Sequence, residues 1–109
     1  MLSNEDSTTL GYMVQGGHGC ISVTANVAPK LCADFQNACQ QGAWDTALVL
    51  QEKLMPLHDA MFVEPSPAPV KYAGSLLGLC TDEVRLPLVA ATDTAREKVR
   101  AAMSDVGLI

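Results

Sequence analysis

The sequence is poor in aromatic side chains and in long apolar runs. Phenylalanine, tryptophan and tyrosine make up 5% of its 109 residues, whereas hydrophobic residues make up 49%. A composition dominated by alanine, leucine and valine favours helices packed on helices over sheet sandwiches. No stretch approaches the ~20 apolar residues that span a bilayer, and residues 1–6 carry neither a basic patch nor an apolar run. We therefore predict no membrane anchor, no signal peptide and a cytoplasmic location.

Positive charge and metal-binding patterns are also scarce. Seven Lys and Arg residues stand against twelve Asp and Glu residues, so a surface that neutralises nucleic-acid phosphates is not expected. The four cysteines form no CxxC pair, and no histidine stands at metal-ligand spacing. We expect no metal site and no cofactor. Cys32 and Cys39 are seven residues apart on a predicted helix, about 10 Å of rise, which is too far for a disulfide.

The spacing of apolar residues predicts helices along most of the chain. Five helices are predicted, over about 6–15, 29–41, 43–62, 69–77 and 94–106. The third contains Pro56, which should bend the helix rather than end it, because the apolar periodicity continues on both sides. The last should begin at a capping box that starts with Thr94 and includes Glu97. Residues 81–91 should be irregular.

One segment is typical of a β-strand. Within 19–23, the apolar residues Ile21 and Val23 alternate with polar ones, and β-branched side chains are frequent. A single strand leaves its backbone donors and acceptors unpaired, so it needs partners that the rest of this sequence does not contain or that another copy supplies. The pattern therefore predicts a mainly helical chain that is part of a larger fold.

Several motifs resemble the dihydrodipicolinate synthase family. The run GGHGCISVTANV (16–27) is similar to the last barrel strand and following turn of that family. Further similar motifs follow in the family's order and spacing, namely LMPLH (54–58), FVEP (62–65), PAPVK (67–71), LGL (77–79) and RLP (85–87). Together these motifs cover the whole chain.

The resemblance implies that the chain is mainly α and forms the C-terminal part of a (β/α)₈ TIM barrel with an appended helical domain. A complete barrel needs about 250 residues, so the earlier strands would lie outside this chain. Residues 1–42 would form the end of the barrel. They would comprise the end of the seventh strand at Leu2-Ser3, the seventh helix, the eighth strand at 19–23 and the eighth helix. Residues 43–109 would form the C-terminal helical domain.

The resemblance also implies an activity. Enzymes of this family condense pyruvate with aspartate semialdehyde in lysine (diaminopimelate) biosynthesis. A strand lysine forms a Schiff base with pyruvate, and a tyrosine-centred relay moves protons. Both groups would lie upstream of this chain, so no catalytic residue is expected here. The chain's own lysines all fall on predicted helices, where a solvated charge is their ordinary role: Lys30, Lys53, Lys71 and Lys98.

Two positions match the family's substrate pocket, and both lie at C-terminal ends of barrel strands, where barrel active sites form. Ile21 corresponds to the residue whose backbone carbonyl faces bound pyruvate. Asn4 stands where the family usually has a glycine close to the same pocket. Its side chain would narrow the pocket, or its backbone would adopt the left-handed conformation that asparagine tolerates.

Three hypotheses for function remain open. The first is part of a lysine-pathway synthase, which the long match favours. The second is part of another pyruvate-dependent lyase, such as N-acetylneuraminate lyase, and the third is a non-catalytic assembly module. Family enzymes are dimers that pair into tetramers, with the helix before the last strand near one contact. The resemblance therefore implies a homo-oligomer in which residues 6–15 approach another copy, and the isolated chain should self-associate.

Overall fold

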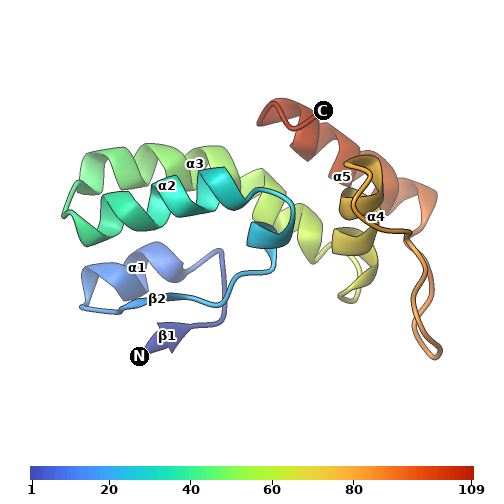
Figure 1. Cartoon of the computed structure of the whole chain (residues 1–109), viewed down its shortest axis with the longest axis horizontal. Helices are drawn as coiled ribbons and strands as arrows, with labels where there is room; N and C mark the ends of the chain where they lie inside the picture. Colours follow the sequence, from blue (N-terminus) through green and yellow to red (C-terminus); the bar gives the residue numbers. More distant parts are fainter. The chain divides into compact units, whose positions relative to one another are not determined.

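The computed structural model describes all 109 residues and is mainly helical (Figure 1). The elements in chain order are β1 (Leu2–Ser3), α1 (Thr9–Val14), β2 (Gly19–Cys20), the 3₁₀ helix η1 (Thr24–Asn26), α2 (Pro29–Gln40), α3 (Trp44–Met61), α4 (Ala68–Leu76) and α5 (Asp93–Asp105). The prediction of a mainly helical chain is confirmed, and an α-helix occupies each of the five predicted regions. None of these helices combines the length and apolar character that a bilayer crossing requires.

The chain divides into two compact units, Met1–Met55 and Pro56–Ile109. The division falls within α3, which continues through Pro56 as predicted. The boundary predicted after residue 42 follows from the family resemblance rather than from compactness, and it stays a prediction.

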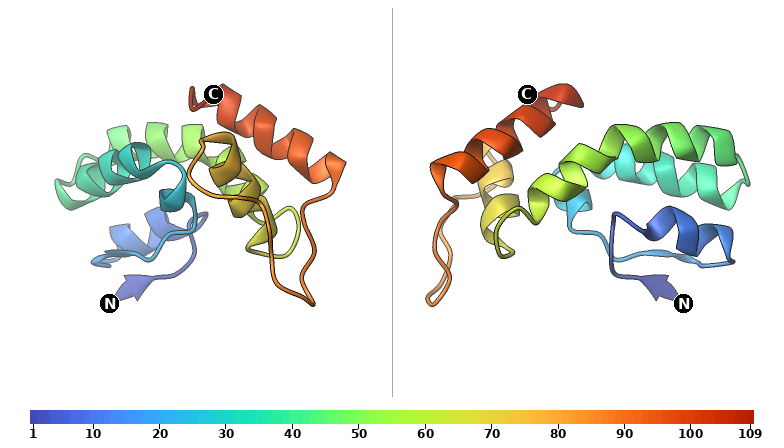
Figure 2. Two further views of the ribbon diagram at one scale, coloured as in Figure 1. Left: turned by 45° about the vertical axis from the view of Figure 1, so that its right-hand side comes forward. Right: turned by 180° about the vertical axis from the view of Figure 1, so that it is seen from behind.

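The N-terminal unit contains a parallel two-stranded sheet. Leu2 pairs with Gly19 and Ser3 pairs with Cys20, and α1 lies between this strand pair and α2 (Figures 1 and 2). The expectation that the strand at 19–23 has no partner within the chain is therefore wrong. A strand of two residues shows no recognisable alternation of apolar and polar side chains, so the hydrophobic pattern did not predict β1. The strand end at Leu2-Ser3 that the family resemblance implied is present.

Two elements of this unit are shorter than predicted. The strand ends at Cys20 instead of residue 23, and α1 begins at Thr9 instead of Asp6. Both differences have one cause, because the Asp6 side chain accepts hydrogen bonds from the backbone of Val23 and Thr24. This contact turns the chain after β2 into η1, and it occupies the carboxylate that was expected to begin α1.

In the C-terminal unit α4 packs against α5. Helical spacing in the sequence predicts a buried stripe of Ala95, Val99, Ala102 and Val106 on α5. The first three are buried, Val106 is only half-buried, and Met103 is buried beside them. The predicted capping box is wrong, because the N-cap is Thr92, whose hydroxyl accepts from the Ala95 amide at 3.3 Å. Residues 81–91 contain no helix or strand, as expected.

Candidate functional site

The carboxyl ends of β1 and β2 lie side by side in the N-terminal unit. Asn4 and Ile21 directly follow the last paired residues, Ser3 and Cys20. The Ile21 amide donates to the Ser3 carbonyl at 2.8 Å, which extends the ladder to this position. The structure therefore brings the two predicted pocket residues to the same edge of the sheet. Contact of either residue with a substrate stays a prediction.

Asn4 is exposed at this edge, and its backbone is not left-handed, since every residue with a positive φ is a glycine. Of the two consequences expected when asparagine replaces the family's glycine, the left-handed backbone is thus wrong. Its side chain stands at the strand end, where a glycine would leave open space.

A buried carboxylate lies directly behind these strand ends. Asp6, on the loop after β1, is only 7% exposed. It accepts hydrogen bonds from the Ser22 hydroxyl, from the Val23 amide at 3.0 Å and from the Thr24 amide at 3.2 Å. Amide and hydroxyl dipoles can satisfy a buried negative charge without a cation. The loop after β1 thereby holds the loop after β2.

Sequence reasoning assigned Asp6 only to the start of a helix and missed this role. The available signal was the pairing of a carboxylate just beyond one strand with a serine just beyond the next. Side chains at the carboxyl ends of adjacent parallel strands lie close together. Without the register between the strands, however, the partner of Asp6 could not be identified.

A second set of hydrogen bonds joins β1, α1 and β2. The buried Thr9 hydroxyl lies 2.5 Å from the Glu5 carbonyl, 3.3 Å from the Ser3 hydroxyl and 3.2 Å from the Cys20 sulfur. Ser3 in turn accepts from the Glu5 amide at 3.2 Å. These contacts fix the short loop that carries Asn4 and Asp6.

The two cysteines of α2 are poor nucleophiles. Burial, with a further contribution from the Asp6 carboxylate, raises the pKa of the Cys32 thiol to about 11, although a hydrogen bond with Ser22 opposes the rise. Burial also raises the pKa of Cys39. Both side chains are therefore neutral thiols near pH 7.

None of the four lysines lies at the strand ends. They belong to α2, α3, α4 and α5 in chain order: Lys30, Lys53, Lys71 and Lys98. Lys71 is half-buried and the others are exposed. A Schiff-base lysine needs a pocket that favours its neutral form, and the strand edge in this chain supplies no amine for that chemistry.

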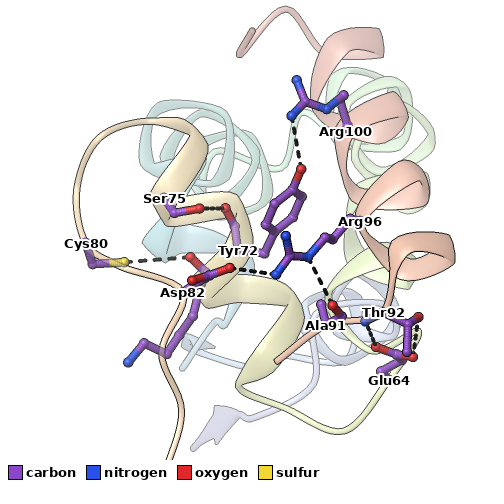
Figure 3. A network of polar contacts seen from close by, with 10 residues as sticks. Glu64, Tyr72, Ser75, Cys80, Asp82, Ala91, Thr92, Arg96 and Arg100 are labelled. Atoms are coloured by element: carbon purple, nitrogen blue, oxygen red, sulfur yellow. Dashed lines mark hydrogen bonds and ion pairs between the residues drawn. The ribbon is translucent and has the colours of Figure 1, made fainter. Parts of the chain in front are cut away.

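The polar network of the C-terminal unit is centred on Arg96 (Figure 3). Its guanidinium forms an ion pair with Asp82 at 2.8 Å, donates to the Ala91 carbonyl at 3.0 Å and lies 4.9 Å from the centre of the Tyr72 ring. Arg100 donates to the Tyr72 hydroxyl at 3.0 Å. The contacts of Arg96 hold the irregular segment 81–91 against α4 and α5.

Glu64 extends this network to the start of α5. Its carboxylate accepts from the Thr92 amide at 2.9 Å and from the Thr92 hydroxyl at 2.7 Å. These two hydrogen bonds lower the pKa of Glu64. The contact spans 28 residues of sequence, and it places Thr92 rather than Thr94 at the N-cap.

The C-terminal unit also has a cavity of about 360 Å³ between the end of α3 and α5. Its floor is formed by small apolar side chains such as Ala60 and Ala102, and its charged members are Asp59, Lys98 and Asp105. These charges form no metal-binding group. The strand edge is therefore the better candidate site.

Comparisons with known proteins match almost the whole chain and favour neither region over the other. Residues 1–106 match the model of the Dihydrodipicolinate synthetase family. The chain is 60% identical over 109 residues to the 4-hydroxy-tetrahydrodipicolinate synthase of Phenylobacterium zucineum, covering 100% of this chain and 37% of that protein. It is 59% identical over 108 residues to the synthase of Parvibaculum lavamentivorans, with coverages of 99% and 37%. The chain thus spans about 37% of the length of these relatives.

Solved structures show the same local fold. The dihydrodipicolinate synthase of Thermotoga maritima matches with a TM-score of 0.96 and 38% identity, over 99% of this chain and 37% of that one. The chloride-inhibited synthase of Acinetobacter baumannii, solved in complex with pyruvate, matches with a TM-score of 0.94 and 37% identity, again over 99% and 37%. Both matches place this chain within a longer protein.

Proposed function

We infer the function of this chain from its family, since it belongs to the dihydrodipicolinate synthetase family. We propose that it forms the C-terminal part of a 4-hydroxy-tetrahydrodipicolinate synthase, a Schiff-base lyase that condenses pyruvate with aspartate semialdehyde in lysine biosynthesis. The observation that carries the proposal is 60% identity over the full 109 residues to one such synthase. The two relatives described above are synthases, which favours this function over an N-acetylneuraminate lyase.

In this proposal the chain shapes the pyruvate pocket but does not react. The carbonyl of Ile21 faces bound pyruvate, and Asn4 borders the same pocket. Support comes from their position together at the carboxyl edge of two parallel strands, the edge at which barrel enzymes build active sites. The reactive lysine and the tyrosine relay belong to the part of the enzyme outside this chain, which agrees with the helical placement of all four lysines here.

The chain alone should therefore form no Schiff base. After incubation with pyruvate and borohydride, which reduces an imine to a stable amine, its mass should be unchanged. A pyruvyl adduct on any of its lysines would contradict the proposal that the reactive lysine lies outside this chain.

The direct test joins this chain to the part of the Phenylobacterium zucineum synthase that lies outside the match. The resulting chimera should condense pyruvate with aspartate semialdehyde and form a borohydride-trapped adduct, whereas the same protein without this chain should not turn over. An inactive but folded chimera would refute the proposed function.

Asn4 offers a sharper variant of this test. Asn4→Gly restores the residue usual in the family and removes a side chain from the pocket, so KM for pyruvate should fall in the chimera. Asn37→Ala, at an exposed position on α2, is the matched control and should leave KM unchanged. Equal KM values for the chimera and for both variants would show that Asn4 does not border the pocket.

We also propose that the enzyme is a homo-oligomer in which α1 contacts a second copy. The resemblance places this helix near another copy, and Val14 is a large apolar residue exposed on it. Val14→Glu should reduce the molecular mass of the chimera in sedimentation, whereas Val49→Glu on the exposed side of α3 should not. An unchanged mass with Val14→Glu would place the contact elsewhere.

A further inference from the structure

We propose that Asp6 is a positioning residue for the carbonyl of Ile21. Its carboxylate holds the backbone that follows β2, and this sets the direction of the carbonyl at the strand end. The inference rests on the proposed function, because it assigns Asp6 a task in the same pyruvate pocket.

The first observation is where the three donors to Asp6 lie. They belong to three consecutive residues, Ser22, Val23 and Thr24, that begin immediately after Ile21. The carbonyl of Ile21 is part of the peptide bond to Ser22. A constraint on Ser22 and on the two following amides therefore restricts the rotation of that peptide plane.

The second observation is how Ile21 is held on its other side. Its amide donates to the Ser3 carbonyl at 2.8 Å. Ser3 is in β1, and Asp6 is in the loop that follows it. This one segment therefore holds both the amide of Ile21 and the residues that follow Ile21. The carbonyl of Ile21 is thus fixed relative to β1.

The third observation is that packing within this chain contributes little to the placement of the Ile21 side chain. It is 66% exposed here and is not part of this chain's core. Within this chain its position depends on backbone hydrogen bonds, and Asp6 accepts the ones that follow it. Active-site groups must be held within about 0.5 Å of their productive geometry, so loss of these hydrogen bonds should weaken substrate binding.

Three substitutions separate this role from a general loss of stability. Asp6→Asn keeps the size of the side chain and one acceptor oxygen, which can still accept from both amides as Oδ2 does here, but its amide nitrogen cannot accept from the Ser22 hydroxyl. Asp6→Ala removes all three bonds. Glu5→Gln is the matched control, because Glu5 is the neighbouring carboxylate, is exposed, and its side chain accepts only from the Ser7 hydroxyl.

The first measurement is amide hydrogen exchange on the 109-residue chain, which does not require activity. Exchange at Val23 and Thr24 should accelerate about 10- to 100-fold in Asp6→Ala, the size expected for losing charge-assisted hydrogen bonds, and less in Asp6→Asn. Inner amides of α2, such as that of Phe35, should be unchanged, as should all amides in Glu5→Gln. Unchanged exchange at Val23 and Thr24 in Asp6→Ala would overturn the proposal.

The second measurement is steady-state kinetics in the chimera. Asp6→Ala should raise KM for pyruvate about 10-fold or more, with a smaller change in kcat, and Glu5→Gln should match the parent protein. A lower kcat with unchanged KM would indicate only a smaller folded fraction and would overturn the positioning role. If the parent chimera is itself inactive, the proposed function fails, and the exchange measurement still decides whether Asp6 holds this backbone.

Discussion

The two units of this chain are stabilised in different ways. In the C-terminal unit, α4 and α5 satisfy their backbone hydrogen bonds internally and bury Val99 and Met103 completely. In the N-terminal unit, two strands of two residues each form a sheet with open edges, and Leu2 and Ile21 are exposed beside it. A short strand pair is marginal without further strands or covering elements. The N-terminal unit is therefore the less self-sufficient of the two.

The polar networks of the two units also differ. Arg96 in the C-terminal unit is a cation with a carboxylate and an aromatic ring beside it. Asp6 in the N-terminal unit is a buried anion that is satisfied by two backbone amides and a hydroxyl. The first network ties a long loop to helices, whereas the second sets the backbone of a strand end. The network of the C-terminal unit thus serves stability, whereas that of the N-terminal unit serves the placement of the backbone after β2.

The largest effect should come from the core of the C-terminal unit. Met103 is 0% exposed, and Met103→Ala should lower the free energy of unfolding of this unit by about 2–5 kcal/mol, because a cavity replaces the side chain. Hydrogen exchange should accelerate in α5 more than in α2. Leu79→Ala, at a residue that is 67% exposed, should change stability by less than about 0.5 kcal/mol. Equal acceleration in both helices would show that the units unfold together.

Thiol reactivity tests whether the surroundings of Asp6 and Cys32 are shielded from solvent. The pKa of Cys32 is raised from its ordinary value of 9.0 to about 11, so at pH 8 its thiolate fraction should be about 100-fold lower than that of an unperturbed thiol. Mass spectrometry after timed iodoacetamide treatment should find the exposed Cys80 modified well before Cys32. Equal rates at the two sites would mean that these surroundings are open to solvent.

Substitution of Arg96 tests the network of the C-terminal unit. Arg96→Lys keeps the charge but loses the planar group that contacts the Tyr72 ring and the Ala91 carbonyl, so it should cost about 1 kcal/mol. Lys30→Gln breaks the exposed pair with Asp34 on α2 and should cost about 0.3–0.5 kcal/mol at most. Urea unfolding of both variants measures the difference, and a larger loss for Lys30→Gln would contradict this ranking.

The smallest effect should be a pH dependence from Glu64. Because hydrogen bonds from Thr92 lower its pKa in the folded chain, the ionised carboxylate stabilises the fold above its ordinary pKa of 4.5. This stabilisation is lost as pH falls through the lowered value. The Tm of the parent chain should exceed that of Glu64→Gln at pH 7, and the two should converge in acid. A difference that persists at low pH would assign the effect to packing.

Family motifs, more than local propensity, led to the candidate site. Asn4 and Ile21 were identified by resemblance, and the register of β1 and β2 then placed them at one sheet edge. The buried stripe of α5 followed from helical spacing alone. Asp6 was missed because its partners lie 16 to 18 residues away, and no local pattern specifies such a pairing.

What the sequence alone determined about this protein is its set of helices, its acidic composition with few aromatic residues, and its family. These properties depend on local spacing and on motifs that can be compared directly. The tertiary structure decided where β2 ends, which threonine caps α5 and what surrounds Ile21. Each of these depends on a hydrogen bond between distant residues, from Asp6 to 22–24 or from Glu64 to Thr92, and such bonds form only once the fold brings the partners together.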